Sequence, residues 1–199
     1  MAKRDYLFAP KVNRISGPAA EPVTVTQAKD HCELLASDTT HDAKLTRYIA
    51  AARQRIENET AYVLMSQTFT LSFDSFPEFD KKIKIPKRPV TSVASITYYD
   101  SDNVQQTLGT DVYGVDTSRM PFVYLKYNQS WPTTIEQHAA CTIQFNAGFG
   151  TADQVPSVLK HLILLQVGSW FYDRGDIPDR DYSMAYDRLW RTVQDSAYP

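Results

Sequence analysis

Two stretches near the start of the chain place apolar residues at helical spacing. In the first, Thr24 and Gln27 have the spacing of a capping box, and Val23 supplies the apolar residue that precedes such a cap. Its apolar positions are Val25, Ala28, Cys32 and Leu35. The pattern predicts a helix that starts after Thr24 and ends near residues 37–38.

The second stretch has the clearest helical pattern in the chain. We expect Thr39 or Thr40 to cap this helix, with Asp42 placed at the positive end of its dipole. One face carries the apolar side chains of Leu45, Ile49, Ala52 and Ile56. Most residues on the other faces are charged, so the helix is expected to lie at the surface of a core.

From residue 66 the apolar period changes from that of a helix to two. Phe69, Leu71 and Phe73 alternate with polar residues, which indicates a half-buried strand. Further strands are expected at 83–85, 93–99, 104–108, 112–116, 122–127 and 141–145. The polar cluster at 100–103 predicts a hairpin turn. Because the connections are short, the sheet is expected to be largely antiparallel.

Two more helices are expected after the strands. Residues 158–171 are apolar on most sides, which indicates a helix buried in a core or between subunits. A loop with the sequence DRGDIPDRD separates it from a last helix that begins near Ser183. The order of elements predicts an α+β fold, in which a helical domain of about four helices contains an inserted, mainly antiparallel β block. Its expected parts are an extended N-terminal arm (1–22), a helical part (23–65), the β insertion (66–147), a helix and loop that complete the helical core (148–182), and a C-terminal helix and tail (183–199).

The bulk composition adds only limits. With 199 residues, of which 43% are hydrophobic, the chain can form one domain with a substantial core. The net charge of −2 gives no global basic field, so any contact with DNA has to be local. We find no signal peptide and no run long enough to span a bilayer, and therefore expect a soluble chain. Cys32 and Cys141 are expected to be free thiols in a reducing compartment.

Gly148 and Gly150 stand between an expected strand and an expected helix, where phosphate-binding loops also lie. A P-loop requires GxxxxGK[ST], but Gly150 is followed by Thr151 and Ala152 with no lysine nearby. A dinucleotide site requires a third glycine within a parallel βαβ unit, and the sheet here is expected to be antiparallel. We therefore interpret the two glycines as a hinge.

One short segment concentrates positive charge. The sequence DKKIKIPKRPV surrounds a short expected strand and contains Lys81, Lys82, Lys84, Lys87 and Arg88. These residues could contact a phosphate backbone or an acidic partner. Lysines also protect edge strands from aggregation, and this is the commoner reason for such a pattern.

Other patterns that would indicate an enzyme or a metal site are missing from the sequence. The four histidines include no HxxxH or HExxH pair, and the aspartates of 173–181 do not have the spacing of a calcium loop. There is no GxSxG motif and no Cys or Ser with a recognisable catalytic partner. We expect no catalytic residues, no cofactor and no metal.

The ordered set of segments resembles the head–tail connector (adaptor) family of tailed bacteriophages. The likeness begins with PVTVTQAKDHCELLASDTTHDAKLTRYIAAARQRIENET, which has the family's PVT-x-x-x-AK helix and an LI-x-AAR-x-x-IE-like helix. It continues through SQTFTLSFDSFP, IKIPKRPVTSVASITYYDSDNVQQTL, YGVDT and SWP. It closes with IQFNAGFGTADQVPSVLKHLILLQVGSWFYDR, and covers about residues 22–175.

The resemblance implies a structural virion protein without catalytic activity. Such proteins form a ring, usually of twelve subunits, that docks beneath the portal protein at the head–tail junction of the virion. The ring extends the channel for double-stranded DNA, which passes without sequence-specific binding, and presents a platform for the downstream stopper or tail protein. The protein would be synthesised in the cytoplasm of the bacterial host. The family pattern also makes the segment from Gly148 to Gly150 the hinge that leads from the β block to the helices.

Two other classes stay open from the sequence. A tail-side joining or terminator protein also forms rings at this junction, and a DNA-binding module could use the lysine-rich strand. An enzyme of unfamiliar type would require a pocket with converging titratable groups, for which the sequence gives no sign. Within the connector hypothesis we expect the C-terminal segment, with Trp190 and Tyr198, to contact the portal, because it is aromatic and outside the resemblance.

Overall fold

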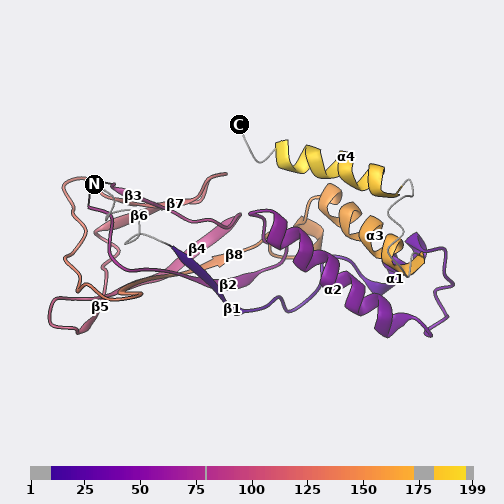
Figure 1. Cartoon of the computed structure of the whole chain (residues 1–199), viewed down its shortest axis with the longest axis horizontal. Coiled ribbons are helices and arrows are strands. Elements are labelled where there is room, and N and C mark those ends of the chain that lie inside the picture. The colour runs from indigo at the N-terminus through magenta and orange to yellow at the C-terminus, as the bar shows by residue number, and fades with distance from the viewer. Residues whose placement is uncertain (1–9, 79, 173–181, 196–199) are drawn as a thin grey trace. The chain divides into compact units, whose positions relative to one another are not determined.

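The computed structural model describes residues 10–78, 80–172 and 182–195 of the chain. The chain forms two compact units, each built from two separate stretches of sequence. The sheet unit comprises Met1–Pro18 and Ser66–Gly148, and the helical unit comprises Ala19–Met65 and Phe149–Pro199. Figure 1 shows the strands in the first unit and the helices in the second. The expected α+β class, with four helices and antiparallel sheets, is confirmed.

The helical unit contains four α-helices and one short 3₁₀ helix. These are α1 (Val25–His31), α2 (Asp42–Glu59), η1 (Ala152–Gln154), α3 (Ser157–Tyr172) and α4 (Tyr182–Asp195). The apolar stripe of α2 that was expected from the sequence is buried. It packs with apolar residues of α1, α3 and α4 in one core. Burial of each large aliphatic side chain contributes about 1.5–3 kcal/mol to folding.

The start of α1 confirms the expected capping box, whereas its end differs from the prediction. The Gln27 backbone N–H donates to Thr24 Oγ1 at 3.2 Å, and the Thr24 N–H donates to Gln27 Oε1 at 2.9 Å. The helix ends at His31 because Glu33 adopts φ 52°. The Leu34 N–H then bonds to the Lys29 carbonyl at 2.9 Å, which completes a Schellman motif. Leu35 therefore lies outside the helix and is 76% exposed, and its expected place in the apolar stripe was wrong.

The expected cap of α2 is also wrong. The helix is preceded by His41, which makes no side-chain capping bond, although Asp42 lies in the first turn as expected. Thr40 is used differently, because its backbone N–H donates to Asp38 Oδ1 at 2.9 Å. This Asx turn fixes residues 38–40 before the helix begins.

Helix α3 is buried over most of its surface, as its sequence predicted. Eight of its residues are buried, and these lie on several sides of the helix: Leu159, Leu162, Ile163, Leu165, Gln166, Val167, Gly168 and Phe171. Helices α1, α2 and α4 all contact it. The sequence left open whether this helix is buried in a core or between subunits. Packing within the helical core of one chain accounts for much of its burial.

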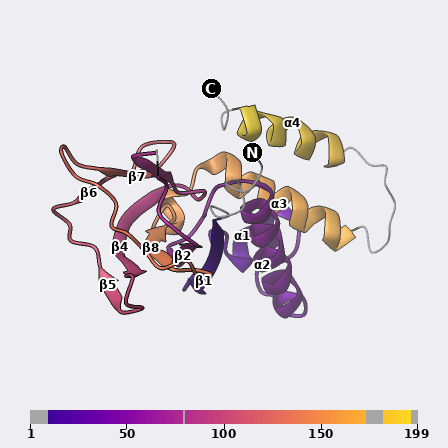
Figure 2. The same cartoon turned by 60° about the vertical axis from the view of Figure 1, so that its left-hand side comes forward.

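The sheet unit contains two antiparallel sheets. The larger has the order β1-β2-β8-β4-β5 and the smaller the order β3-β7-β6 (Figure 2). Their strands are β1 (Lys11–Ser16), β2 (Gln67–Phe73), β3 (Lys82–Lys84), β4 (Val90–Tyr99), β5 (Gln105–Thr107), β6 (Tyr113–Asp116), β7 (Phe122–Leu125) and β8 (Cys141–Ala147). All pairs are antiparallel, as expected from the short connections.

The core of the larger sheet follows from the period-two pattern. In β2 and β8, buried residues alternate with half-buried ones along the whole strand. Phe69 pairs with Phe145 and Leu71 pairs with Ile143, so the apolar residues of both strands lie on one face. The two phenylalanine rings stack with their centroids 5.6 Å apart.

One strand was not anticipated. Lys11–Ser16, which the sequence placed in an extended N-terminal arm, form β1 at the edge of the larger sheet. Most residues of β1 are exposed, so the segment shows no buried alternation that could have revealed it. Arg14 Nη1 donates to the buried Gln67 Oε1 on β2 at 3.3 Å. Pairing with β2 supplies the hydrogen bonds that the isolated segment would lack.

Candidate functional site

The lysine-rich segment forms the edge of the smaller sheet. Among the described strands, β3 pairs with β7 alone, and it exposes Lys82 and Lys84 while it buries Ile83. Lys81, just before the strand, is exposed as well. Lys82 and Lys84 therefore point away from the core on the same face, as residues two apart in a strand must.

Two aromatic residues share this face with the lysines. The register places Tyr124 beside Lys82 and Phe122 beside Lys84. Lys82 Nζ lies 4.6 Å from the centroid of the Phe122 ring, within the range of a cation–π interaction. The rings of Phe122 and Tyr124 are 5.9 Å apart in an edge-to-face arrangement. We call Lys81, Lys82, Lys84, Phe122 and Tyr124 the basic face.

A glycine on the neighbouring strand makes room for the exposed tyrosine. Gly114 of β6 pairs with Tyr124, and a Cβ atom at Gly114 would lie 2.5 Å from Tyr124 Cζ. The ring of Tyr124 therefore lies across the glycine and remains 37% exposed. No sequence pattern indicated this aromatic part of the face, because it depends on strand pairing.

The remaining two basic residues of the segment lie elsewhere. Lys87 is half-buried, and Arg88 is buried with 8% of its surface exposed. Arg88 is followed by a cis peptide bond to Pro89. The five residues that were expected to form one cluster thus divide into three exposed lysines and two enclosed residues.

The two glycines of the expected hinge lie where the chain passes from the sheet unit to the helical unit. Gly148 is the last residue of the sheet unit, with φ 125°, and its N–H bonds to the Pro89 carbonyl at 2.9 Å. Gly150 has φ 97°. Both values belong to conformations that side-chain-bearing residues rarely adopt. The Gln154 side chain, after Gly150, accepts a bond from the Thr151 N–H at 2.9 Å.

The expected portal-contact residues divide between described and undescribed parts of the chain. Trp190 is half-buried in α4 and stacks on Tyr186, with ring centroids 5.8 Å apart. Tyr186 and Val193 of the same helix are buried in the helical core. Arg55 of α2 lies over the Tyr186 ring, 5.3 Å from its centroid. Tyr198 lies outside the described residues.

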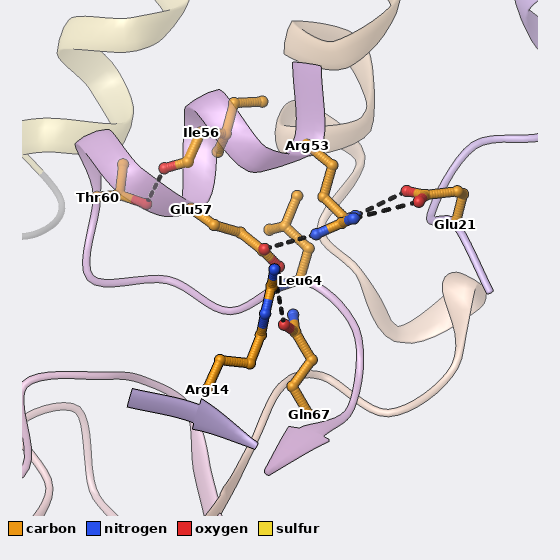
Figure 3. A network of polar contacts seen from close by, with 8 residues as sticks. All are labelled: Arg14, Glu21, Arg53, Ile56, Glu57, Thr60, Leu64 and Gln67. Atoms are coloured by element: carbon orange, nitrogen blue, oxygen red, sulfur yellow. Dashed lines mark hydrogen bonds and ion pairs between the residues drawn. The ribbon is translucent and has the colours of Figure 1, made fainter. Parts of the chain in front are cut away.

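A buried charge network lies in the helical unit (Figure 3). Arg53 donates to both carboxylate oxygens of Glu21, at 2.7 and 3.2 Å, and to Glu57 Oε2 at 2.7 Å. Glu57 Oε1 accepts a bond from the Leu64 backbone N–H at 2.9 Å. Burial acts to lower the pKa of Arg53, but the hydrogen bonds and charges of Glu21 and Glu57 outweigh it and raise the pKa. The network links α2 to the segments on either side of it in the chain.

The described ranges show little that resembles a reaction centre. In them, no group of three or more His, Cys, Asp or Glu residues could hold a metal ion. His31 and His161 are in edge-to-face contact, and burial followed by the charge of His161 lowers the pKa of His31. None of the described helices combines the length and apolar composition that a membrane crossing requires.

The comparison with protein families identifies the class of protein. The family described as phage gp6-like head-tail connector protein matches residues 22–129, which is more than half of the chain. The chain therefore belongs to this family of structural, non-enzymatic connector proteins. Its place is the head–tail junction of a phage-like particle. No curated protein matches the chain in sequence.

Solved structures share the fold. A chain from the neck of an empty GTA particle with C6 symmetry has a TM-score of 0.72 at 22% identity, covering 83% of this chain and 86% of that one. A chain from the virion of a native gene transfer agent particle has a TM-score of 0.73 at 21% identity, covering 89% and 94%. A chain from the neck of a native GTA particle with C12 symmetry has a TM-score of 0.68 at 23% identity, covering 83% and 85%.

Proposed function

We propose that copies of this chain form a ring of twelve subunits that docks on the portal. The ring extends the DNA channel and provides the attachment platform for the next connector or the tail. The observation that carries this proposal is the shared fold with chains from particle necks that were computed with C6 and C12 symmetry. Membership of the head–tail connector family supports the same position in the particle.

The mode of DNA contact follows from the charge of the chain. A net charge of −2 provides no general attraction for duplex DNA, so DNA would pass through the channel without sequence-specific binding. Basic residues on the channel wall would be few. Lys81, Lys82 and Lys84 are exposed and accessible for such a contact or for an acidic neighbour, whereas Lys87 is half-buried and Arg88 is buried.

We further propose that the C-terminal segment, with Trp190 and Tyr198, contacts the portal. Trp190 retains an accessible part in the described structure, since it is only half-buried. A large deletion from residue 183 onward is a poor test, because it also removes Tyr186 and Val193 from the core. Deletion of residues 196–199 and the substitution Trp190→Ala test the contact more directly. Undiminished portal binding by both variants would remove this part of the proposal.

Gly148 and Gly150 are proposed as the hinge between the two units. Their positive φ values and their position at the unit boundary support this role. A hinge of this kind would let the sheet unit and the helical unit of each subunit adjust when a ring meets the portal.

Electron microscopy of the purified chain, alone and mixed with its cognate portal protein, tests the proposed function. We expect rings, either free or stacked on the portal, and image classification gives the number of subunits. Dispersed monomers in both samples would contradict the proposal. A titration with duplex DNA at low and high salt then tests whether the chain is a DNA-binding module instead, since such binding falls steeply with salt.

A further inference from the structure

Opposite charges are separated along the sequence of the sheet unit. Residues 81–88 contain five basic residues and no acidic one. Residues 89–118 contain no Lys or Arg, and they carry Asp100, Asp102, Asp111 and Asp116. Asp111 and Asp116 lie outside the β4–β5 hairpin, and Asp116 is on β6 of the smaller sheet. Asp100 and Asp102 give the turn of the hairpin a negative charge, opposite to that of the basic face.

No ion pair within the described part of the chain neutralises the positive charge of the basic face. Lys82 and Lys84 form no ion pair there, although the charge of Lys82 contributes to the low pKa of Asp116 after the bonds to Ser118. Met120, in the β6–β7 turn, is 57% exposed, and Tyr124, on β7, is 37% exposed. The face thus combines positive charge with exposed Tyr and Met, two residue types that are enriched at protein interfaces.

The β4–β5 hairpin presents the complementary features on a fixed turn. Asp100 Oδ1 accepts bonds from the backbone N–H groups of Asp102 and Val104, at 3.0 and 2.9 Å. Its other carboxylate oxygen accepts from Gln106 Nε2 at 2.8 Å. These bonds hold the turn, so Asp102 and Val104 project from a defined backbone, and both are exposed. Neither Asp100 nor Asp102 forms an ion pair with a described residue.

The two surfaces lie on opposite sides of the sheet unit. In Figures 1 and 2, β6 and β7 lie in the upper part of this unit and β5 lies in its lower part. Two different, complementary surfaces on opposite sides of a subunit are what a head-to-tail contact requires, and such contacts form a ring when the rotation between neighbouring subunits closes.

We propose that the β4–β5 hairpin of one copy docks on the basic face of the next copy. Asp102 would face Lys82 and Lys84, and Val104 would lie against the Tyr124 ring. This inference rests on the proposed ring. Duplex DNA would use the lysines but has no need of exposed Tyr124 and Met120 beside them. Protection of an edge strand explains the lysines of β3 but not the charge and exposed Val104 of the hairpin.

Two reversed variants test the contact through their mixture. One variant carries Lys82→Glu and Lys84→Glu, and the other carries Ser101→Lys and Asp102→Lys. Each alone opposes like charges across every contact, so we expect the subunit association constant to fall about a hundredfold or more. In an equal mixture, alternating copies restore opposite charges at every contact. The mixture is therefore expected to form rings in which the two variants alternate.

The measurement is native mass spectrometry with electron microscopy, carried out with and without portal protein. Lys11→Glu, on exposed β1, and Asp153→Lys, at an exposed position of η1, reverse one charge each elsewhere and are expected to assemble like the unchanged chain. Circular dichroism and thermal melting establish that every variant folds.

Several outcomes would overturn the proposal. If each reversed variant forms rings alone, the contact does not lie at these surfaces. If both lose rings and the mixture fails to restore them, the charges do not face each other. Rings that form normally but lose the portal, or lose affinity for duplex DNA, would assign the basic face to those partners instead. If the unchanged chain forms no ring with or without portal, the proposed function fails as well.

Discussion

Arg53 and Glu57, one turn apart in α2, form an ion pair with both side chains buried. Their exposed fractions are 3% and 6%, and Arg53 Nη1 lies 2.7 Å from Glu57 Oε2. Glu21 satisfies the other side of the guanidinium, and the Leu64 N–H satisfies the second oxygen of Glu57. A buried charge retained in this way depends on every partner, because removal of one leaves the others uncompensated.

The substitution Arg53→Ala is expected to lower the free energy of unfolding by about 3–5 kcal/mol, because it leaves the buried Glu57 carboxylate without a counter-charge. Chemical denaturation measures the change. The matched control is Glu59→Ala, which removes the exposed pair between Arg55 and Glu59 on the same helix. Its cost is expected to be at most about 0.5 kcal/mol. Equal effects of the two substitutions would contradict the account of a buried network.

The substitution Gly150→Ala is expected to destabilise the chain by about 1–2 kcal/mol, because alanine rarely adopts φ 97° and its Cβ would collide with the Gln154 side chain. Gly17→Ala is the control, since a Cβ there meets no atom within 4 Å. That change is expected to be neutral or slightly stabilising. Urea unfolding of both variants provides the comparison, and a neutral Gly150→Ala would argue against a strained backbone at this position.

A double-mutant cycle tests how Tyr124 lies on Gly114. Gly114→Ala alone is expected to cost about 1–3 kcal/mol, because the new Cβ displaces the Tyr124 ring. In a chain that already carries Tyr124→Ser, the same change is expected to cost clearly less. Thermal unfolding of the four proteins gives the coupling between the two positions. Additive effects would mean that the ring does not cover the glycine.

Helix α4 is expected to stabilise the folded chain through the side chains that it buries in the helical core. Val193→Ala removes a side chain that is buried in the helical core, and it should cost about 1–3 kcal/mol. The adjacent Thr192 is exposed, and Thr192→Ala should change stability by no more than about 0.5 kcal/mol. Denaturation curves of the two variants distinguish a docked helix from one that lies free, for which both changes would be small.

Burial raises the pKa of the Cys141 thiol to about 12. At pH 8 the thiolate is then about 10⁻⁴ of the total, against roughly a quarter for a free cysteine with a pKa near 8.5. Cys141 is expected to react with a thiol reagent about a thousandfold more slowly in the folded chain than in denaturant. The raised pKa also means that its contribution to stability is present below about pH 8.5 and is lost as the pH rises toward 12. Rapid labelling of Cys141 in the native chain would contradict its burial.

Short-range sequence patterns predicted the features that depend only on residues close to one another in the sequence. The capping box of Thr24 and Gln27 and the alternation in β2 both have short-range causes, and both are found. The end of α1 was missed, because the left-handed turn at Glu33 is taken by a residue that rarely adopts it. Strand β1 was missed because an exposed edge strand requires no apolar alternation.

The basic face could be predicted only in part, because it also depends on residues that are distant from one another in the sequence. The charge of 81–88 is visible in the sequence, but which of its residues are accessible depends on the fold around Arg88. The aromatic residues of the basic face belong to β7, about 40 residues further along the chain. Only the pairing of β3 with β7 brings them next to the lysines. A sequence pattern without pairing information cannot bring Lys82 and Tyr124 together.

The first and last strands of the inserted β block, β2 and β8, pair with each other. Gln67, near its first residue, and Ala147, near its last, face each other on β2 and β8. The two cut ends of the surrounding helical sequence are thus held close together by the block itself. Because its two ends lie close together, such a block can be lengthened, shortened or replaced while the helices keep their core. Related connectors could in this way present different surfaces to different particles while their helical core stays the same.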